Sequence, residues 1–60
     1  MLEFIETLLN EVRKLREDTY MLLINGGVRD MEQYKFLMGR LEGYKLVEEV
    51  IQTLLRRADD

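Results

Sequence analysis

Apolar residues in the first part of the chain recur in steps of three and four residues. The clearest stripe contains Ile5, Leu8, Val12, Leu15, Thr19 and Leu22, and it is widened by Phe4, Leu9 and Leu23. This spacing places side chains on one face of an α-helix. It predicts a first helix over residues 2–24.

The helical pattern stops at Asn25-Gly26-Gly27 and restarts after Asp30. Glycine readily adopts the left-handed backbone conformation that ends a helix, so we expect Gly26 or Gly27 to end the first helix. Asp30 and Gln33 have the spacing of a capping box at the start of a new helix. The sequence therefore predicts a turn over residues 25–30.

The second part of the chain carries two apolar stripes at helical spacing. One contains Tyr34, Leu37, Leu41, Tyr44, Glu48, Ile51 and Leu55. The other lies about a third of a turn away and contains Phe36, Gly39, Gly43, Leu46, Val47, Val50 and Leu54. This pattern predicts a helix over residues 31–57, followed by a frayed tail over residues 58–60. The fold class is all-α, with a single domain over residues 1–60 that forms an antiparallel two-helix hairpin.

One neighbouring helix cannot cover both stripes of the second helix. A single core in so short a chain supplies at most about 3–5 kcal/mol of stability, and the chain has no cysteine for a disulfide. We therefore expect oligomerisation, or docking to a larger protein, to complete the hairpin. The alternative is one wide face with some exposed leucines. The candidate interaction residues are Phe36, Gly39, Gly43, Leu46, Val50 and Leu54.

Gly39 and Gly43 are spaced by four residues and so lie on the same face of the second helix. An interior helical glycine costs about 1 kcal/mol relative to alanine. The pair therefore indicates a place where another backbone approaches closely. The spacing leaves open whether that backbone belongs to the first helix or to another protein.

The composition argues against catalysis. The 60 residues include no histidine, cysteine or serine, so the imidazole base, the thiolate–imidazole metal site and the usual nucleophiles are missing. We expect no enzyme activity, no catalytic or metal-binding residue and no cofactor. The longest apolar run, residues 20–24, is far shorter than the roughly 20 residues of a membrane span, so we expect no membrane partner.

A basic cluster on the first helix is the main indication of a different function. Arg13, Lys14 and Arg16 lie near Tyr20, and small dimeric helical hairpins that bind RNA exist. Acidic residues flank the cluster, however, and the formal net charge is −3, which opposes binding to a phosphate backbone. A dimeric hairpin that binds nucleic acid is therefore the less favoured alternative function. Changing the three basic residues to Gln should leave assembly nearly intact, since exposed helical ion pairs contribute only about 0.3–0.5 kcal/mol each.

The region around the turn has a recognisable pattern. It reads Asn25-Gly26-Gly27-Val28-Arg29-Asp30-Met31-Glu32-Gln33-Tyr34-Lys35 and continues through Met38-Gly39-Arg40-Leu41-Glu42-Gly43. This segment resembles short helical-hairpin proteins encoded among the structural genes of tailed bacteriophages. The resemblance implies a virion structural or assembly protein near the head, portal or neck, located in the virion or the host cytoplasm. Its expected partner is itself, a larger phage structural protein, or both. The alternative is a small regulator that binds and inhibits a host or phage protein.

Overall fold

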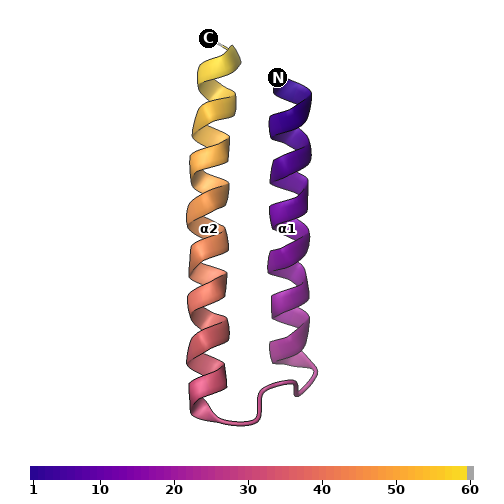
Figure 1. The fold of residues 1–60 in the computed structure, drawn as a ribbon, viewed down its shortest axis with the longest axis vertical. Helices are drawn as coiled ribbons and strands as arrows, with labels where there is room; N and C mark the ends of the chain where they lie inside the picture. Colours follow the sequence, from indigo (N-terminus) through magenta and orange to yellow (C-terminus); the bar gives the residue numbers. More distant parts are fainter. Residues whose placement is uncertain (60) are drawn as a thin grey trace.

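The computed structural model describes the backbone of residues 1–59 and the side chains of residues 1–57. This part of the chain forms two helices, α1 over Leu2–Ile24 and α2 over Met31–Asp59, and contains no strand. The helices run antiparallel and side by side, so the N-terminus lies near the C-terminal end of α2 (Figure 1). The hairpin is elongated, with extents of 46 × 15 × 12 Å. With 88% of the residues helical, the predicted all-α hairpin is confirmed.

The end of α2 differs from the prediction. The helix continues to Asp59 and not to residue 57, so the frayed tail is wrong for residues 58 and 59; residue 60 lies outside the described residues. Arg56 and Arg57 lie in the last turn, where positive charge favours the negative end of the helix dipole. Ala58 is a strong helix former, and neither residue 59 nor residue 60 is a glycine or proline that would stop the helix.

Two adjacent glycines end α1. Gly26 has a φ of 77°, which is the left-handed conformation that residues with a Cβ rarely adopt. The N–H of Gly27 donates to the carbonyl oxygen of Leu22 at 2.8 Å, and a Cβ on Gly27 would lie 2.9 Å from that same oxygen. Gly26 therefore supplies the turn conformation, and Gly27 allows the close approach that ends the helix.

The start of α2 is capped by side chains, as the Asp30–Gln33 spacing predicts. The Asp30 carboxylate accepts a hydrogen bond from the N–H of Gln33 at 2.8 Å. The Gln33 side-chain oxygen accepts one from the N–H of Arg29 at 2.9 Å, where a standard capping box would use the N–H of Asp30. Both bonds fix the direction in which the chain enters α2.

The two helices meet along a narrow seam. Its buried hydrophobic residues are Leu9, Val12, Leu37, Leu41 and Ile51. Three partly buried residues pack against the cluster formed by Leu9, Val12 and Ile51; they are Ile5, Tyr44 and Leu55. On α2 the seam therefore uses the first of the two predicted stripes from Leu37 onward, whereas Tyr34 at its start is exposed.

On α1 the seam keeps Ile5, Val12 and Thr19 of the predicted stripe but differs at every other position. Leu8, Leu15 and Leu22 are each more than 40% exposed. The positions that follow them, 9, 16 and 23, are buried or half-buried. The sets 5-8-12-15-19-22 and 5-9-12-16-19-23 both alternate steps of three and four, so hydrophobic spacing alone does not distinguish them. Position 16 faces α2 because Arg16 pairs there with a buried glutamate, Glu48.

Candidate interaction surface

Most of the large apolar side chains lie outside the seam. Among the described side chains, five hydrophobic residues are buried, whereas sixteen large hydrophobic residues are exposed. Single exposed apolar residues are normal on protein surfaces, but contiguous patches mark binding sites. The arrangement of these sixteen residues therefore decides whether the hairpin has an interaction surface.

Half of the exposed apolar residues share one relation to the seam, since each immediately precedes a residue that faces the other helix. They are Phe4, Leu8, Leu15 and Leu22 on α1, and Phe36, Val47, Val50 and Leu54 on α2. Successive residues of a helix are roughly 100° apart. In two antiparallel helices of the same hand, the preceding positions turn toward the same flat side of the pair. These eight residues therefore line one side of the hairpin, which we call the apolar face.

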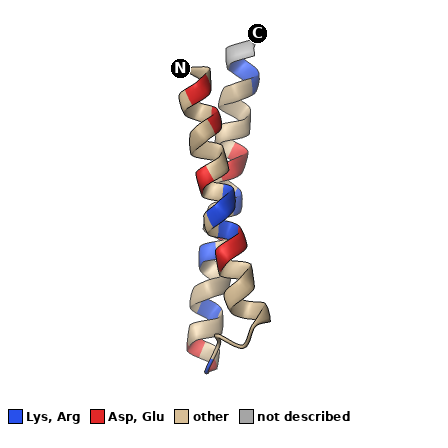
Figure 2. Ribbon diagram, turned by 90° about the vertical axis from the view of Figure 1, so that its right-hand side faces the viewer, with Lys and Arg blue, Asp and Glu red and all other residues tan. Residues whose placement is uncertain are grey.

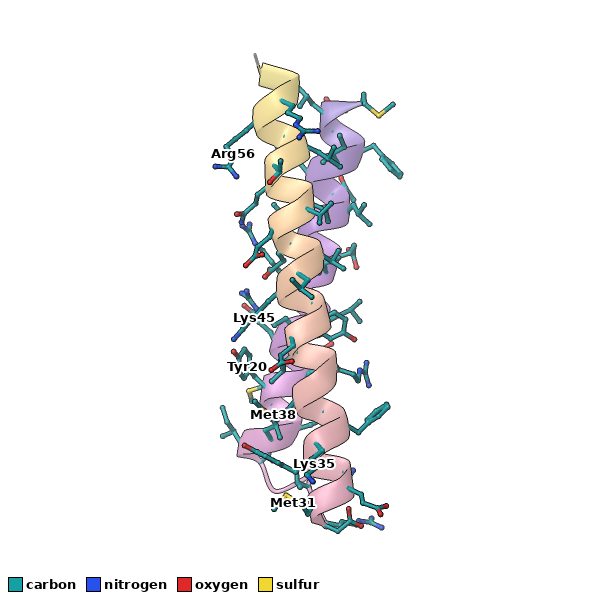
Figure 3. The ribbon with its side chains drawn as sticks, turned by 90° about the vertical axis from the view of Figure 1, so that its left-hand side faces the viewer. Tyr20, Met31, Lys35, Met38, Lys45 and Arg56 are labelled. Atoms are coloured by element: carbon teal, nitrogen blue, oxygen red, sulfur yellow. The ribbon has the colours of Figure 1, made fainter. Side chains whose placement is uncertain are left out.

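The residues that follow the seam positions line the opposite side. Figure 3 shows four of them, Tyr20 of α1 with Met38, Lys45 and Arg56 of α2, along one edge of the hairpin. The others are mostly polar and include Glu6, Asn10, Arg13, Glu17, Glu42, Glu49 and Gln52. The hairpin therefore has one mainly apolar side, interrupted by Glu11, Asp18 and Arg40, and one mainly polar side.

The predicted interaction residues on α2 are all exposed. Phe36, Val50 and Leu54 lie on the apolar face itself. Leu46 is 62% exposed and lies two residues before a seam position, so it points away from α1. The structure therefore places three of these four apolar residues on the apolar face and one beside it.

The two helical glycines do not contact α1. A Cβ built on Gly39 or on Gly43 meets no atom within 4 Å. Of the two interpretations left open by the sequence, close packing of the glycines against the first helix is therefore wrong. Gly43 precedes the seam residue Tyr44 and so lies on the apolar face, whereas Gly39 lies one row further from α1.

The hydrophobic spacing does not reveal the half of the apolar face that α1 contributes. Phe4, Leu8, Leu15 and Leu22 belong to the stripe that predicts the first helix, but this stripe does not show which of its residues face away from α2. Arg16 is the signal that could have separated the two sets, because it is the charged residue of the set 5-9-12-16-19-23. An arginine facing α2 needs an acidic partner, and Glu48 lies on the inner stripe of α2.

A charged group lies in the middle of the seam. Glu48 is only 6% exposed, and its Oε2 accepts a hydrogen bond from Arg16 Nη1 at 2.6 Å. Its Oε1 has no hydrogen bond but lies 3.6 Å from Arg13 Nε. Thr19, also buried, donates its hydroxyl to the carbonyl oxygen of Leu15. The seam is therefore partly polar, in contrast to the apolar face.

These contacts neutralise the basic cluster of α1. Arg13 and Arg16 pair with Glu48, and Lys14 lies 3.9 Å from Glu11. Figure 2 shows the basic segment of α1 with acidic segments on both sides. The assumption that all three basic residues are merely surface charges is wrong for Arg16, whose side chain is 30% exposed. Replacing all three with Gln should therefore weaken the hairpin and not leave it unchanged.

No other kind of site is evident in residues 1–57. In that range no group of three acidic, histidine or cysteine side chains is placed to hold a metal ion. Neither α1 nor α2, as far as each is described, has the length and apolar character needed to cross a bilayer. No protein-family model matches the chain, and no curated protein or solved structure matches it.

Proposed function

We propose that this chain is a non-enzymatic helical interaction module that assembles with other protein through its apolar face. The observation that carries the proposal is the placement of eight exposed apolar side chains on one side of the hairpin. A protein partner that covers this side removes their apolar surface from water, which is the main favourable term in association.

The small seam supports the same proposal. Its five buried hydrophobic residues are few for a chain of this length, and hairpins of this size gain at most about 3–5 kcal/mol from one core. The chain contains no cysteine that could add a disulfide. Association through the apolar face would add the missing burial, because binding to the folded state stabilises it.

We further propose that the module is a bacteriophage virion structural or assembly protein near the head, portal or neck. This context is supported by the resemblance of residues 25–43 to short proteins encoded among phage structural genes. Two residues in that segment, Gly26 and Asp30, form the turn and the helix cap. The resembling segment is thus the one that determines the hairpin shape.

Protein is a better-supported partner than nucleic acid. Binding to a phosphate backbone requires uncompensated positive charge. Arg13 and Arg16 instead pair with a buried carboxylate, and Lys14 lies beside Glu11. The apolar face, in contrast, offers exposed apolar side chains that a protein partner can bury.

The test compares two double variants with the same change in charge. Leu15→Glu with Val47→Glu places two carboxylates in the middle of the apolar face. Tyr20→Glu with Gln52→Glu places two on the opposite side. Light scattering, with circular dichroism to confirm helicity, should detect assembly of the wild type with itself or with purified portal, neck or capsid proteins. We expect the first variant to lose assembly and the second to keep it.

Two results would overturn the proposal. One is equal loss, or equal retention, of assembly in both double variants. The other is a wild-type chain that binds neither itself nor any of the virion proteins. The phage context has its own measurement: mass spectrometry of purified virions should detect the chain, and its absence from the particle would favour the regulatory alternative.

A further inference from the structure

We propose that a second copy of this chain covers the apolar face, so that two hairpins form a four-helix bundle in which α1 of each copy packs on α2 of the other. This inference rests on the proposed function, since it assumes that the apolar face is the assembly surface. It adds the identity of the partner and the relative arrangement of the two copies.

The size of the face fits a second copy. The flat side of the hairpin measures 46 × 15 Å between Cα atoms, or roughly 700 Å² per copy. Two copies packed face to face would bury about 1,400 Å², within the 1,200–2,000 Å² of stable, specific interfaces. A twofold dimer uses the same patch on both copies, so an apolar face of this length finds an equally long apolar face on its partner.

The pattern on both helices is the one found in four-helix bundles. Each helix carries two adjacent apolar rows at heptad spacing. One row, which includes Val12 on α1 and Ile51 on α2, is used within the hairpin. The other row, which includes Leu15 and Val47, is exposed. Helices of a four-helix bundle contact two neighbours through two such rows, whereas this hairpin supplies one neighbour to each helix.

The charges on the apolar face decide between two arrangements. The acidic positions that precede seam residues, Glu11 and Asp18, lie on α1, and the basic one, Arg40, lies on α2. A twofold axis across the helices would stack α1 on α1 and bring the acidic residues of both copies together. An axis parallel to the helices stacks α1 on α2 and places the acidic row opposite the helix that carries Arg40. Like charges in close contact oppose association, so the second arrangement is favoured.

This arrangement predicts one specific contact. Ile51 lies in one cluster with Leu9 and Val12, so it lies at the height of residues 9–12 of the antiparallel helix. Val50, one residue along, therefore lies near the height of Glu11. An axis parallel to the helices preserves height. Glu11 of one copy should therefore lie opposite Val50 of the other. Gly43, on the same row as Val50 and with no atom near its Cβ position, leaves room for the second α1 to approach.

Disulfide trapping tests the contact directly, because the chain has no cysteine of its own. Four single-cysteine chains are made: Glu11→Cys, Val50→Cys, Asp18→Cys and the control Lys45→Cys. Mixed under mild oxidation, the Glu11→Cys and Val50→Cys chains should form a mixed disulfide dimer at least about tenfold faster than either chain alone, since a disulfide needs Cβ atoms about 3.5–4.5 Å apart. Lys45→Cys, on the opposite side, serves as the control and should cross-link with neither.

The outcomes separate this inference from the proposed function. Sedimentation equilibrium of the wild type should give twice the chain mass, together with the mixed Glu11–Val50 disulfide. Faster cross-linking of Glu11→Cys with Asp18→Cys would overturn the arrangement in favour of α1 stacked on α1. A wild type that stays monomeric, or forms a different oligomer, would overturn the second copy as partner. In that case the proposed function is still tested separately, by measuring whether the Leu15→Glu, Val47→Glu double variant loses assembly with virion proteins.

Discussion

The seam between the helices and the apolar face differ in a way that reverses the usual distribution of side chains. The seam buries five hydrophobic residues but also Glu48 and Thr19, with two arginines against the glutamate. The apolar face carries leucines, valines and two phenylalanines in contact with solvent. Most globular domains bury such residues and expose their charges. The seam thus determines which helix surfaces pair, while the face carries half of the exposed large apolar side chains.

The polar group explains how the seam selects one pairing. Two helical stripes of similar spacing could slide past each other by a turn or rotate to the neighbouring row. Either change would remove Glu48 from Arg16 and leave a buried carboxylate without its partner, which is strongly unfavourable. Aliphatic residues alone would discriminate less, because leucine and valine pack in several registers. We infer that Glu48 contributes specificity to the hairpin more than net stability.

The largest predicted effect is on the seam. Leu41→Ala removes a side chain that is only 2% exposed, and such changes typically cost about 2–5 kcal/mol. Urea denaturation followed by circular dichroism, at one fixed protein concentration, should show most of the folding free energy lost. Leu46→Ala is the matched control: the same change at a side chain that points away from α1 should alter the free energy of unfolding by at most about 0.5 kcal/mol. Similar losses for both variants would contradict the division between the seam and the outer surface.

A smaller effect should follow from removing the charge at the centre of the seam. Glu48→Ala leaves Arg16 without its 2.6 Å hydrogen bond. Breaking a fully buried pair costs about 3–5 kcal/mol, but both arginine side chains are partly exposed, so we expect about 1–3 kcal/mol in thermal and urea unfolding. Glu48→Leu combined with Arg16→Leu should recover most of this loss.

Lys14→Gln provides the comparison for that variant. Its pair with Glu11 is long, at 3.9 Å, and both side chains are well exposed. Exposed pairs of this kind contribute about 0–1 kcal/mol. An equal change for Lys14→Gln and Glu48→Ala would show that the seam charge is as weakly coupled to the fold as a surface charge.

The sequence was sufficient to predict the helices, the turn and the inner stripe of α2. Gly26 and the Asp30–Gln33 cap act through backbone conformation and hydrogen bonds within a few residues, so local pattern specifies them. The α1 side of the apolar face could not be predicted in this way. The registers that contain Leu8 and Leu9 are equally periodic, and the choice between them depends on a contact between Arg16 and Glu48, 32 residues apart. The outward position of the glycines likewise depends on which stripe of α2 faces α1.

The two glycines give a smaller predicted effect than the seam, and one of the opposite sign. Alanine at either Gly39 or Gly43 meets no neighbouring atom, and alanine is more favourable than glycine inside a helix by about 1 kcal/mol. Each substitution should therefore raise the midpoint of thermal unfolding of the hairpin. A lower midpoint for Gly39→Ala would contradict the open space around Gly39, whereas a lower midpoint for Gly43→Ala alone would indicate that a second copy approaches Gly43 closely.

Leucine substitutions at the same two positions should affect association differently, because only Gly43 lies on the apolar face. Gly43 lies on the face, so a leucine there would occupy the space that a second copy needs, and overpacking typically costs about 1–3 kcal/mol. Gly39 lies one row further out, where a leucine should be tolerated. We therefore expect Gly43→Leu to remain helical by circular dichroism but to associate more weakly in sedimentation equilibrium, with Gly39→Leu close to the wild type. If both leucine variants associate as the wild type does, Gly43 faces solvent in the assembled protein, and the contact must lie nearer to Val47 and Leu15 along the inner edge of the face.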